Sequence, residues 1–234
     1  MDKIEKKIFN VLKTIGLIIL LLTFQAIPIF LFRIDLNKYS ITARTLYLLT
    51  TDIILIIIYI LLYKKDIIKD FKKYFNKNIF DNLKTSITYW IIGLIIMLSI
   101  NYIIVIITKN GISQNEQSVR ELIDKVPLYM IFISIIYAPI TEEIIFRKSI
   151  KNITDNKYLY PILSGLSFGI MHVILSMKST QELIFIIPYS AIGYVFAKCY
   201  QKTNNIFSTI TAHALHNSLT LIIYLTSKFV WKNF

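Results

Sequence analysis

Three charged side chains interrupt an apolar run in the stretch Thr141-Glu142-Glu143-Ile144-Ile145-Phe146-Arg147. The run extends from Tyr129 to Ile150 and is long enough to cross a bilayer, which takes about 20 residues. A charged residue near the middle of a membrane helix costs roughly 2.5 to 3.5 kcal/mol on insertion scales. Three such residues within six positions therefore indicate a site around which the rest of the chain is organised.

The composition predicts an integral membrane protein. The chain has 234 residues, of which 55% are hydrophobic, and its mean hydropathy is +0.59. Soluble domains hold about 45 to 50% apolar residues by a count that includes glycine. The excess here falls in blocks that reach the length of a membrane span. Since an isolated strand cannot satisfy its backbone in lipid, we predict an all-α fold, a polytopic transmembrane helical bundle of about seven to eight helices in one compact membrane domain.

Seven apolar blocks are the predicted spans. We expect residues 1–126 to hold the N-terminal transmembrane helices and an amphipathic connection, and residues 127–228 to hold the helices that carry the chemistry. The first block is too long for the core of a signal peptide, so we interpret it as a retained helix. The predicted spans are residues 8–32, 45–63, 87–108, 127–150, 161–177, 182–200 and 206–228.

The basic connection at residues 64–84 carries seven lysines against three aspartates. Its apolar residues recur near helical spacing, which predicts an amphipathic helix on the membrane surface, in contact with membrane lipids. A solvated basic loop is the alternative interpretation. The apolar residues in question are Ile67, Ile68, Phe71, Phe75 and Phe80.

The formal net charge of +12 would favour nucleic-acid binding in a soluble protein. Here the lysines and arginines lie mostly between the apolar blocks, and the sequence has no RNA-binding motif or phosphate loop, so nucleic acid is not an expected partner. With the N-terminus inside, the inner connections hold sixteen of these cations and the outer ones nine. Positively charged connections stay in the cytoplasm. The bias predicts a multi-pass protein of the cell membrane with a cytoplasmic N-terminus and a carboxylate cluster that faces the cytosol.

Helix geometry separates the two acids of the charged stretch. Glu143 and Arg147 are four residues apart and share a face, with the acid on the favourable N-terminal side, so we predict a supporting ion pair. Glu142 lies about a quarter-turn away and is left without this partner. A carboxyl held in such surroundings is suited to act as a general base. Pro139 comes just before the acids and is expected to kink the helix and release a carbonyl near the site.

Two further apolar helices offer polar side chains that are expensive in lipid unless they have a partner. His172 follows Phe168 by one turn on the same side of its helix. His213 and Asn217 are four residues apart and share a face, with His216 beside them as a satisfied neighbour. We therefore expect one cavity to receive side chains from three helices.

Water activation is the chemistry that these residues favour. Glu142 and His172 can hold and deprotonate a water, while His213 and Asn217 can donate hydrogen bonds to the oxyanion of a tetrahedral intermediate. The motifs contain no serine or cysteine nucleophile beside a histidine, so we do not expect covalent catalysis. We also expect no cofactor. Zinc is the open alternative, with Glu142, His172 and His213 as ligands and one free position. A third interpretation is a buried polar network that only holds helices together, although such hydrogen bonds average about 0.6 kcal/mol.

Three motifs in this order resemble the CAAX protease and bacteriocin-processing family, also called the CPBP or ABI family. They are EExxxR at Glu142, Glu143 and Arg147, FxxxH at Phe168 and His172, and HxxxN at His213 and Asn217. The resemblance covers about residues 127–227. It implies an intramembrane endopeptidase with a cavity open to the cytosolic side. In that family the first glutamate and the FxxxH histidine activate water and the HxxxN pair forms the oxyanion hole, with Glu143, Arg147 and Phe168 in support.

The sequence therefore predicts a membrane-embedded endopeptidase that hydrolyses a membrane-associated peptide or protein. The family resemblance implies prenylated CAAX proteins as substrates of its eukaryotic branch, and peptide maturation or bacteriocin self-immunity for its bacterial members. A non-enzymatic membrane protein, such as an immunity factor that binds a toxin or partner, is the alternative function. A transporter is disfavoured, because the first three predicted spans offer almost no polar pathway.

Overall fold

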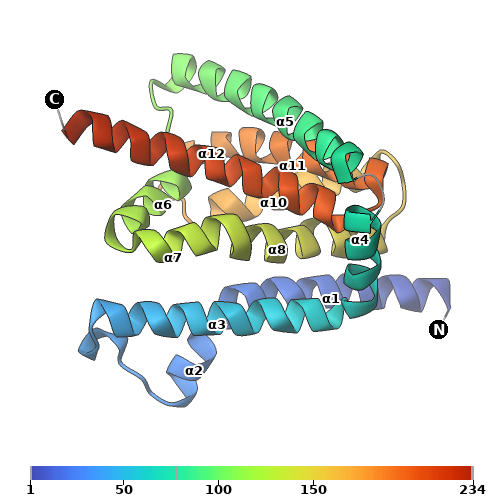
Figure 1. The fold of residues 1–234 in the computed structure, drawn as a ribbon, viewed down its shortest axis with the longest axis horizontal. Helices are drawn as coiled ribbons and strands as arrows, with labels where there is room; N and C mark the ends of the chain where they lie inside the picture. Colours follow the sequence, from blue (N-terminus) through green and yellow to red (C-terminus); the bar gives the residue numbers. More distant parts are fainter. Residues whose placement is uncertain (1, 77–78, 233–234) are drawn as a thin grey trace.

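The computed structural model describes residues 2–76 and 79–232, and within them every regular element is helical. Figure 1 shows the long helices running side by side along one direction, with the N-terminus and the C-terminus at opposite ends of the bundle. The elements in chain order are α1 (Lys3–Thr23), α2 (Ala26–Leu31), η1 (Leu36–Lys38), α3 (Ile41–Leu62), α4 (Lys64–Asn76), α5 (Ile79–Thr108), α6 (Gln114–Lys125), α7 (Pro127–Phe132), η2 (Ile133–Tyr137), α8 (Ala138–Glu143), η3 (Ile144–Ser149), α9 (Ile150–Ile153), α10 (Leu159–Ile174), η4 (Thr180–Phe185), α11 (Ile186–Thr203) and α12 (Ile206–Lys232).

Five helices of the described chain are long and apolar enough to cross a membrane. Their positions match five of the seven predicted spans, and the all-α membrane bundle that the sequence predicts is confirmed. A sixth apolar helix, α10, is shorter. The five helices cover Ile41–Leu62, Ile79–Thr108, Pro127–Ile153, Thr180–Thr203 and Ile206–Val230.

The first predicted span, residues 8–32, is not one helix. It divides into α1 and α2 at Phe24 and Gln25, three residues before Pro28. Proline lacks the N–H that would continue the hydrogen-bond ladder. At the break, the carbonyl of Gln25 accepts a hydrogen bond from Tyr47 Oη of α3 at 2.6 Å. A tertiary partner thus satisfies the backbone where the helix breaks.

Two other boundaries differ from the prediction. The span predicted at 161–177 is α10, which begins at Leu159 and ends at Ile174. The segment predicted to be amphipathic, residues 64–84, is α4 only as far as Asn76. Residues 79–84 already belong to α5, which begins eight residues before the predicted span, and residues 77–78 lie outside the described residues. The prediction that this segment is helical is confirmed for Lys64–Asn76, and the alternative of a solvated loop is wrong there.

Glycines allow α10 and α11 to pack with their backbones in close approach. A Cβ atom added at Gly165 would lie 2.7 Å from the Ser190 carbonyl oxygen, and one added at Gly193 would lie 3.2 Å from the Gly165 backbone. Small residues at such crossings are typical of membrane helix pairs. The close packing holds α10, with Phe168 and His172, firmly against α11.

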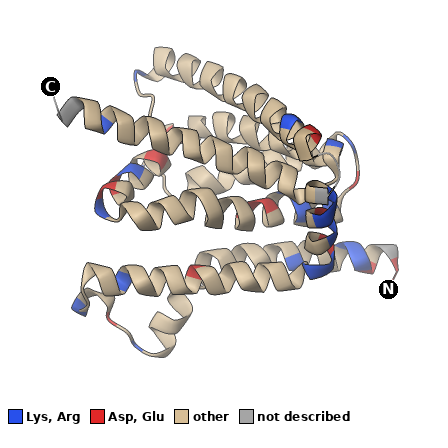
Figure 2. Cartoon of the chain, viewed as in Figure 1, with Lys and Arg blue, Asp and Glu red and all other residues tan. Residues whose placement is uncertain are grey.

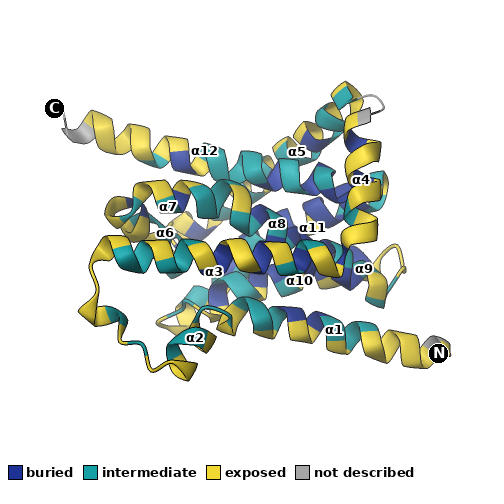
Figure 3. Ribbon diagram, turned by 60° about the horizontal axis from the view of Figure 1, so that its bottom comes forward, coloured by how far each residue is buried: buried dark blue, intermediate teal, exposed yellow. Residues whose placement is uncertain are grey.

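The core lies around the charged stretch. Ile144, Ile145 and Phe146 are fully buried and pack against Phe168 of α10 and Phe196 of α11. Figure 3 shows buried residues gathered along α8, α10 and α11, while α1 and the outer half of α12 are largely exposed. In a membrane span, the exposed apolar surface faces lipid. The core therefore surrounds the helix that bears the two carboxylates.

Candidate active site

The helix from Pro127 to Ile153 carries both carboxylates and contains two π-helical segments, η2 and η3, on either side of α8. Such wider turns inside α-helices occur often at functional sites. In η2 the Ala138 N–H bonds to the Ile133 carbonyl, five residues back. The next donor in that register would be Pro139, which has no N–H.

Pro139 therefore leaves the Ser134 carbonyl free of a helix partner. That oxygen accepts a hydrogen bond from Asn217 Nδ2 of α12 at 2.9 Å. The sequence predicted that Pro139 would release a carbonyl near the site, and the structure shows which side chain uses it. Because an amide nitrogen carries two hydrogens, Asn217 keeps a second donor after it has been oriented by Ser134.

Glu143 and Arg147 form the predicted ion pair, and both side chains are fully buried. Arg147 Nε lies 2.8 Å from Glu143 Oε2, and Nη2 lies 3.1 Å from Oε1. Arg147 Nη1 donates to Ser164 Oγ at 2.9 Å, and the guanidinium lies 5.0 Å from the centre of the Phe168 ring. The hydrogen bonds satisfy a cation that would otherwise be costly inside the membrane.

Glu143 also fixes His213. Its Oε1 lies 3.0 Å from His213 Nδ1. The paired carboxylate can only accept, so Nδ1 must carry a proton. His213 Nε2 is then the nitrogen left for the site, and it lies 3.9 Å from Glu142 Oε2.

His172 is fixed in the same way by a different acceptor. Its Nδ1 lies 2.9 Å from the Phe168 carbonyl oxygen and must donate to it. Its Nε2 lies 3.6 Å from Glu142 Oε2. The imidazole is held between two rings, with centroids 4.2 Å from Phe168 and 5.0 Å from Tyr189. The neutral ring therefore presents an acceptor nitrogen to Glu142.

Glu142 is where the three helices meet. Its Oε2 faces the Nε2 atoms of His172 and His213 at distances longer than a hydrogen bond, and it finds no hydrogen-bond donor among the described residues. The Glu142 and His172 side chains are 16% and 18% exposed, so the site is not sealed. Two acceptor atoms 3.6 Å apart can share one water that donates to both.

Asn217 lies one turn beyond His213 on the same face of α12. His216 was predicted to be a satisfied neighbour, and this does not hold for one of its ring nitrogens. Its Nδ1 is buried and has no hydrogen-bond partner within the described part of the chain. The structure thus brings Glu142, His172 and His213 together and orients Asn217 beside them.

The sequence analysis missed two polar residues, the partly buried Tyr189 and the buried Asp52. Tyr189 stacks on His172, and its hydroxyl lies 3.0 Å from Ser113 Oγ; no sequence pattern marks it. Asp52 is fully buried in α3, where it accepts hydrogen bonds from Gln25 Nε2 at 2.7 Å and Tyr129 Oη at 2.8 Å. An acid alone in an apolar span was a signal that could have found Asp52.

A zinc site requires at least three donor side chains arranged around one point. Over residues 2–76 and 79–232, no group of three or more His, Cys, Asp or Glu side chains is arranged to hold a metal ion. We therefore derive no step through zinc from Glu142, His172 and His213.

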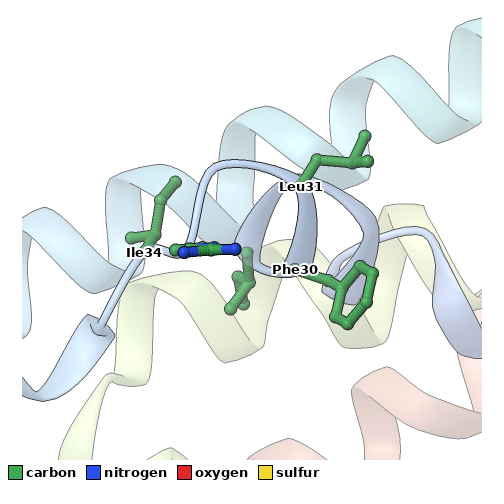
Figure 4. Close-up of a pocket in the computed structure, with 5 residues that line it drawn as sticks. Phe30, Leu31 and Ile34 are labelled. Carbon is green, nitrogen blue, oxygen red and sulfur yellow. The ribbon is translucent and has the colours of Figure 1, made fainter.

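Two surface hollows lie away from these residues. One, of about 500 Å³, is formed at α2 and the turn after it, as Figure 4 shows around Phe30, Leu31 and Ile34. The other, of about 320 Å³, lies between Ile92 of α5 and Tyr194 of α11. Neither is lined by the four predicted site residues.

The C-terminal part of the chain is similar to a known protein family. Residues 124–219, which contain all four predicted site residues, match the family described as type II CAAX prenyl endopeptidase Rce1-like. The "Putative membrane peptidase YdiL" of Bacillus subtilis is 34% identical over 155 residues, which cover 62% of this chain and 59% of that protein. The resemblance predicted from the three motifs is confirmed.

Two further relatives have less informative names. UPF0177 protein YxdF of Lactococcus lactis is 24% identical over 171 residues, 70% of this chain and 88% of that protein. An uncharacterized protein of Mycoplasma capricolum is 27% identical over 101 residues, 43% of this chain and 29% of that protein. The chain thus spans about three fifths of the Bacillus relative. No solved structure matches it.

Proposed function

Because residues 124–219 carry the match to the type II CAAX prenyl endopeptidase family, we propose that this chain is an intramembrane endopeptidase that hydrolyses a membrane-associated peptide or protein. One observation carries the proposal. Glu142 Oε2 faces the Nε2 atoms of two histidines, and the Nδ1 atom of each histidine is held by a fixed acceptor. Helix packing alone does not require this convergence, because Glu143 and Arg147 already neutralise each other.

In the proposed reaction, a water donates hydrogen bonds to Glu142 and to His172 Nε2. Glu142 takes a proton as the water oxygen bonds to the carbonyl carbon of the scissile peptide, and the carbonyl π electrons move to oxygen. Collapse of this tetrahedral intermediate re-forms the carbonyl and breaks the C–N bond. Glu142 returns the proton to the departing amine nitrogen. The products are a carboxylic acid and an amine, and no covalent enzyme intermediate is formed.

The oxyanion is the proposed partner of Asn217 and His213. Asn217 offers the N–H that Ser134 does not use. Since the Nδ1 proton of His213 is committed to Glu143, His213 can donate to the oxyanion only from Nε2, and only as an imidazolium. The Glu143 carboxylate stabilises that cation. This assignment gives Glu143 a second task besides its pairing with Arg147.

Replacing Asn217 by Ala should lower kcat about 10²- to 10³-fold with little change in KM, because the lost donor acts on charge that develops in the transition state. Steady-state kinetics in vesicles measure both constants. The matched control is Thr220→Ala, at an exposed position on the same helix. An Asn217→Ala chain that raises KM and keeps kcat would place Asn217 in substrate binding instead.

Metal dependence separates the proposed mechanism from the zinc alternative. We expect purified, active protein to contain less than about 0.1 zinc per chain and to keep its rate after dialysis against a chelator, whereas a zinc enzyme binds about one ion and loses activity. Elemental mass spectrometry and the cleavage rate provide the two readouts. Stoichiometric zinc together with chelator-sensitive cleavage would replace the metal-free assignment.

We place the protein in the cell membrane with its N-terminus in the cytoplasm. Figure 2 shows lysines and arginines gathered around α4 and the first turns of α1. Lys69→Cys, in α4, should react with an impermeant maleimide only after cells are opened, while Lys38→Cys, at the other end of the bundle, should react in intact cells. Both lysines are exposed and the native Cys199 is buried, so the labelling reports the new thiols. The reverse pattern would invert the orientation.

A cleavage experiment tests the function. The purified chain, in vesicles, is incubated with membrane peptides extracted from the cells that make it, and the new peptide N-termini are identified. The proposal expects specific termini that appear with the wild-type chain and are absent when Glu142 is replaced by Gln. An extract that gains no termini with folded wild-type protein contradicts it.

A further inference from the structure

Helix α4 lies across the ends of the membrane-spanning helices, roughly perpendicular to them in Figure 1. Hydrogen bonds hold it there. Asp70 Oδ2 accepts from the Ile206 N–H at 3.0 Å, and Asn205 Nδ2 donates to the Asp70 carbonyl at 2.8 Å. Tyr74 Oη donates to Thr211 Oγ1 at 3.1 Å. The helix therefore has a fixed position at one end of the bundle.

The outer surface of α4 has an apolar strip beside its buried side. Ile68, Phe71 and Phe75 are spaced by three and four residues, share one face and are about half exposed. Phe207, at the start of α12, extends the strip, with ring centroids 5.6 Å from Phe71 and 5.9 Å from Phe75. Phe side chains on the apolar face of an interfacial helix lie at the boundary between lipid headgroups and acyl chains.

Next to this strip, α4 presents a row of lysines. Lys65, Lys69 and Lys72 share a second face by the same spacing, and all three are exposed. The two acids of α4 do not neutralise them. Asp66 pairs with Lys148 at 3.3 Å, and Asp70 is buried against the backbone of α12. The lysine face is thus free to attract negative charge from outside the chain.

We infer that α4 is a binding surface for anionic phospholipid. The apolar strip enters the acyl region and the lysine face contacts the headgroup phosphates, as in interfacial helices whose attachment combines apolar burial with attraction to anionic lipid. The inference does not depend on the proposed peptidase activity. The helix is joined to two of the three helices that supply site residues, through Lys148 and through Ile206. Bound lipid thereby fixes the ends of these helices at the membrane surface.

Native mass spectrometry of the purified full chain, titrated with phosphatidylglycerol or with phosphatidylcholine of equal chain length, tests the inference. The variant Lys65→Gln/Lys69→Gln/Lys72→Gln removes the lysine face. Since each lysine near an anionic surface contributes about a factor of five, the loss of three lysines should lower the affinity for phosphatidylglycerol about 100-fold. The affinity for phosphatidylcholine should not change.

The matched control is Lys6→Gln/Lys7→Gln/Lys84→Gln, which removes the same charge from exposed positions near the starts of α1 and α5. It should lower the affinity for phosphatidylglycerol less than the first variant does, because these three lysines do not form one face beside the apolar strip. Equal losses in the two variants, or no loss in the first, would overturn the inference. The inference would also be overturned if poly-glutamate displaced bound phosphatidylglycerol more strongly than added phosphatidylglycerol does. That result would assign the lysine face to an acidic protein segment. Both variants alter only exposed side chains, so we expect them to fold. Thermal unfolding measurements check this.

Discussion

Replacing Glu142 by Gln is expected to lower the rate of peptide cleavage by about 10³-fold or more while the protein remains folded in the membrane. Glutamine has nearly the same shape but cannot accept the proton of the attacking water, and general-base catalysis contributes about 10² to 10⁴. Among the described residues, Glu142 makes no ion pair with a lysine or arginine, and Glu143 rather than Glu142 holds Arg147. The substitution should therefore spare stability.

The control for this experiment is Glu121→Gln, the same chemical change at an exposed acid on α6. It should leave both rate and stability unchanged. If Glu142→Gln retains cleavage, then Glu142 is not the base. If the cell keeps protection against a toxin when both Glu142 and His172 are replaced, the non-enzymatic immunity function is favoured instead.

Replacing Arg147 by Met is expected to destabilise the folded protein by about 3 to 5 kcal/mol, because it leaves the buried Glu143 carboxylate without its counter-charge. Arg147 is fully buried and also donates to Ser164 at 2.9 Å. A loss of that size is a large share of the stability of an ordinary domain. Thermal unfolding in detergent and the yield of folded protein measure it.

The matched control is Arg120→Met, which breaks another pair of the same i,i+4 spacing, with Glu116, in a partly exposed position. Exposed pairs are worth about 0 to 1 kcal/mol, so this change should be nearly silent. The double variant Glu143→Leu/Arg147→Met should recover much of the stability but not the activity, since His213 would lose the acceptor for its Nδ1 proton. A stable Arg147→Met protein would contradict the role given to the pair.

Local helix geometry explains why much of the site could be predicted from the sequence. Spacing by four residues placed Glu143 with Arg147, and it separated Glu142 from that pair. The absence of an N–H on Pro139 predicted a released carbonyl, which the structure finds at Ser134. These inferences needed only residues within one or two turns of each other.

The features that were missed depend on contacts between distant segments. The break after α1 is stabilised by Tyr47, which lies 22 residues beyond Gln25. Tyr189 reaches His172 only because glycines let α10 and α11 approach closely. The Nδ1 of His216, which has no hydrogen-bond partner among the described residues, likewise reflects the packing around α12. The residue periodicity of one helix does not specify which other helix packs against it.

The central claim is that Glu142 and His172 act on the same water, and a double-mutant cycle tests it most directly. The cleavage rates of Glu142→Gln, His172→Gln and the double variant are measured in vesicles with one substrate. Residues that act as a unit are strongly non-additive. The account predicts that the double variant is no slower than the slower single variant. If the two losses multiply instead, the two side chains act independently and the shared-water mechanism is wrong.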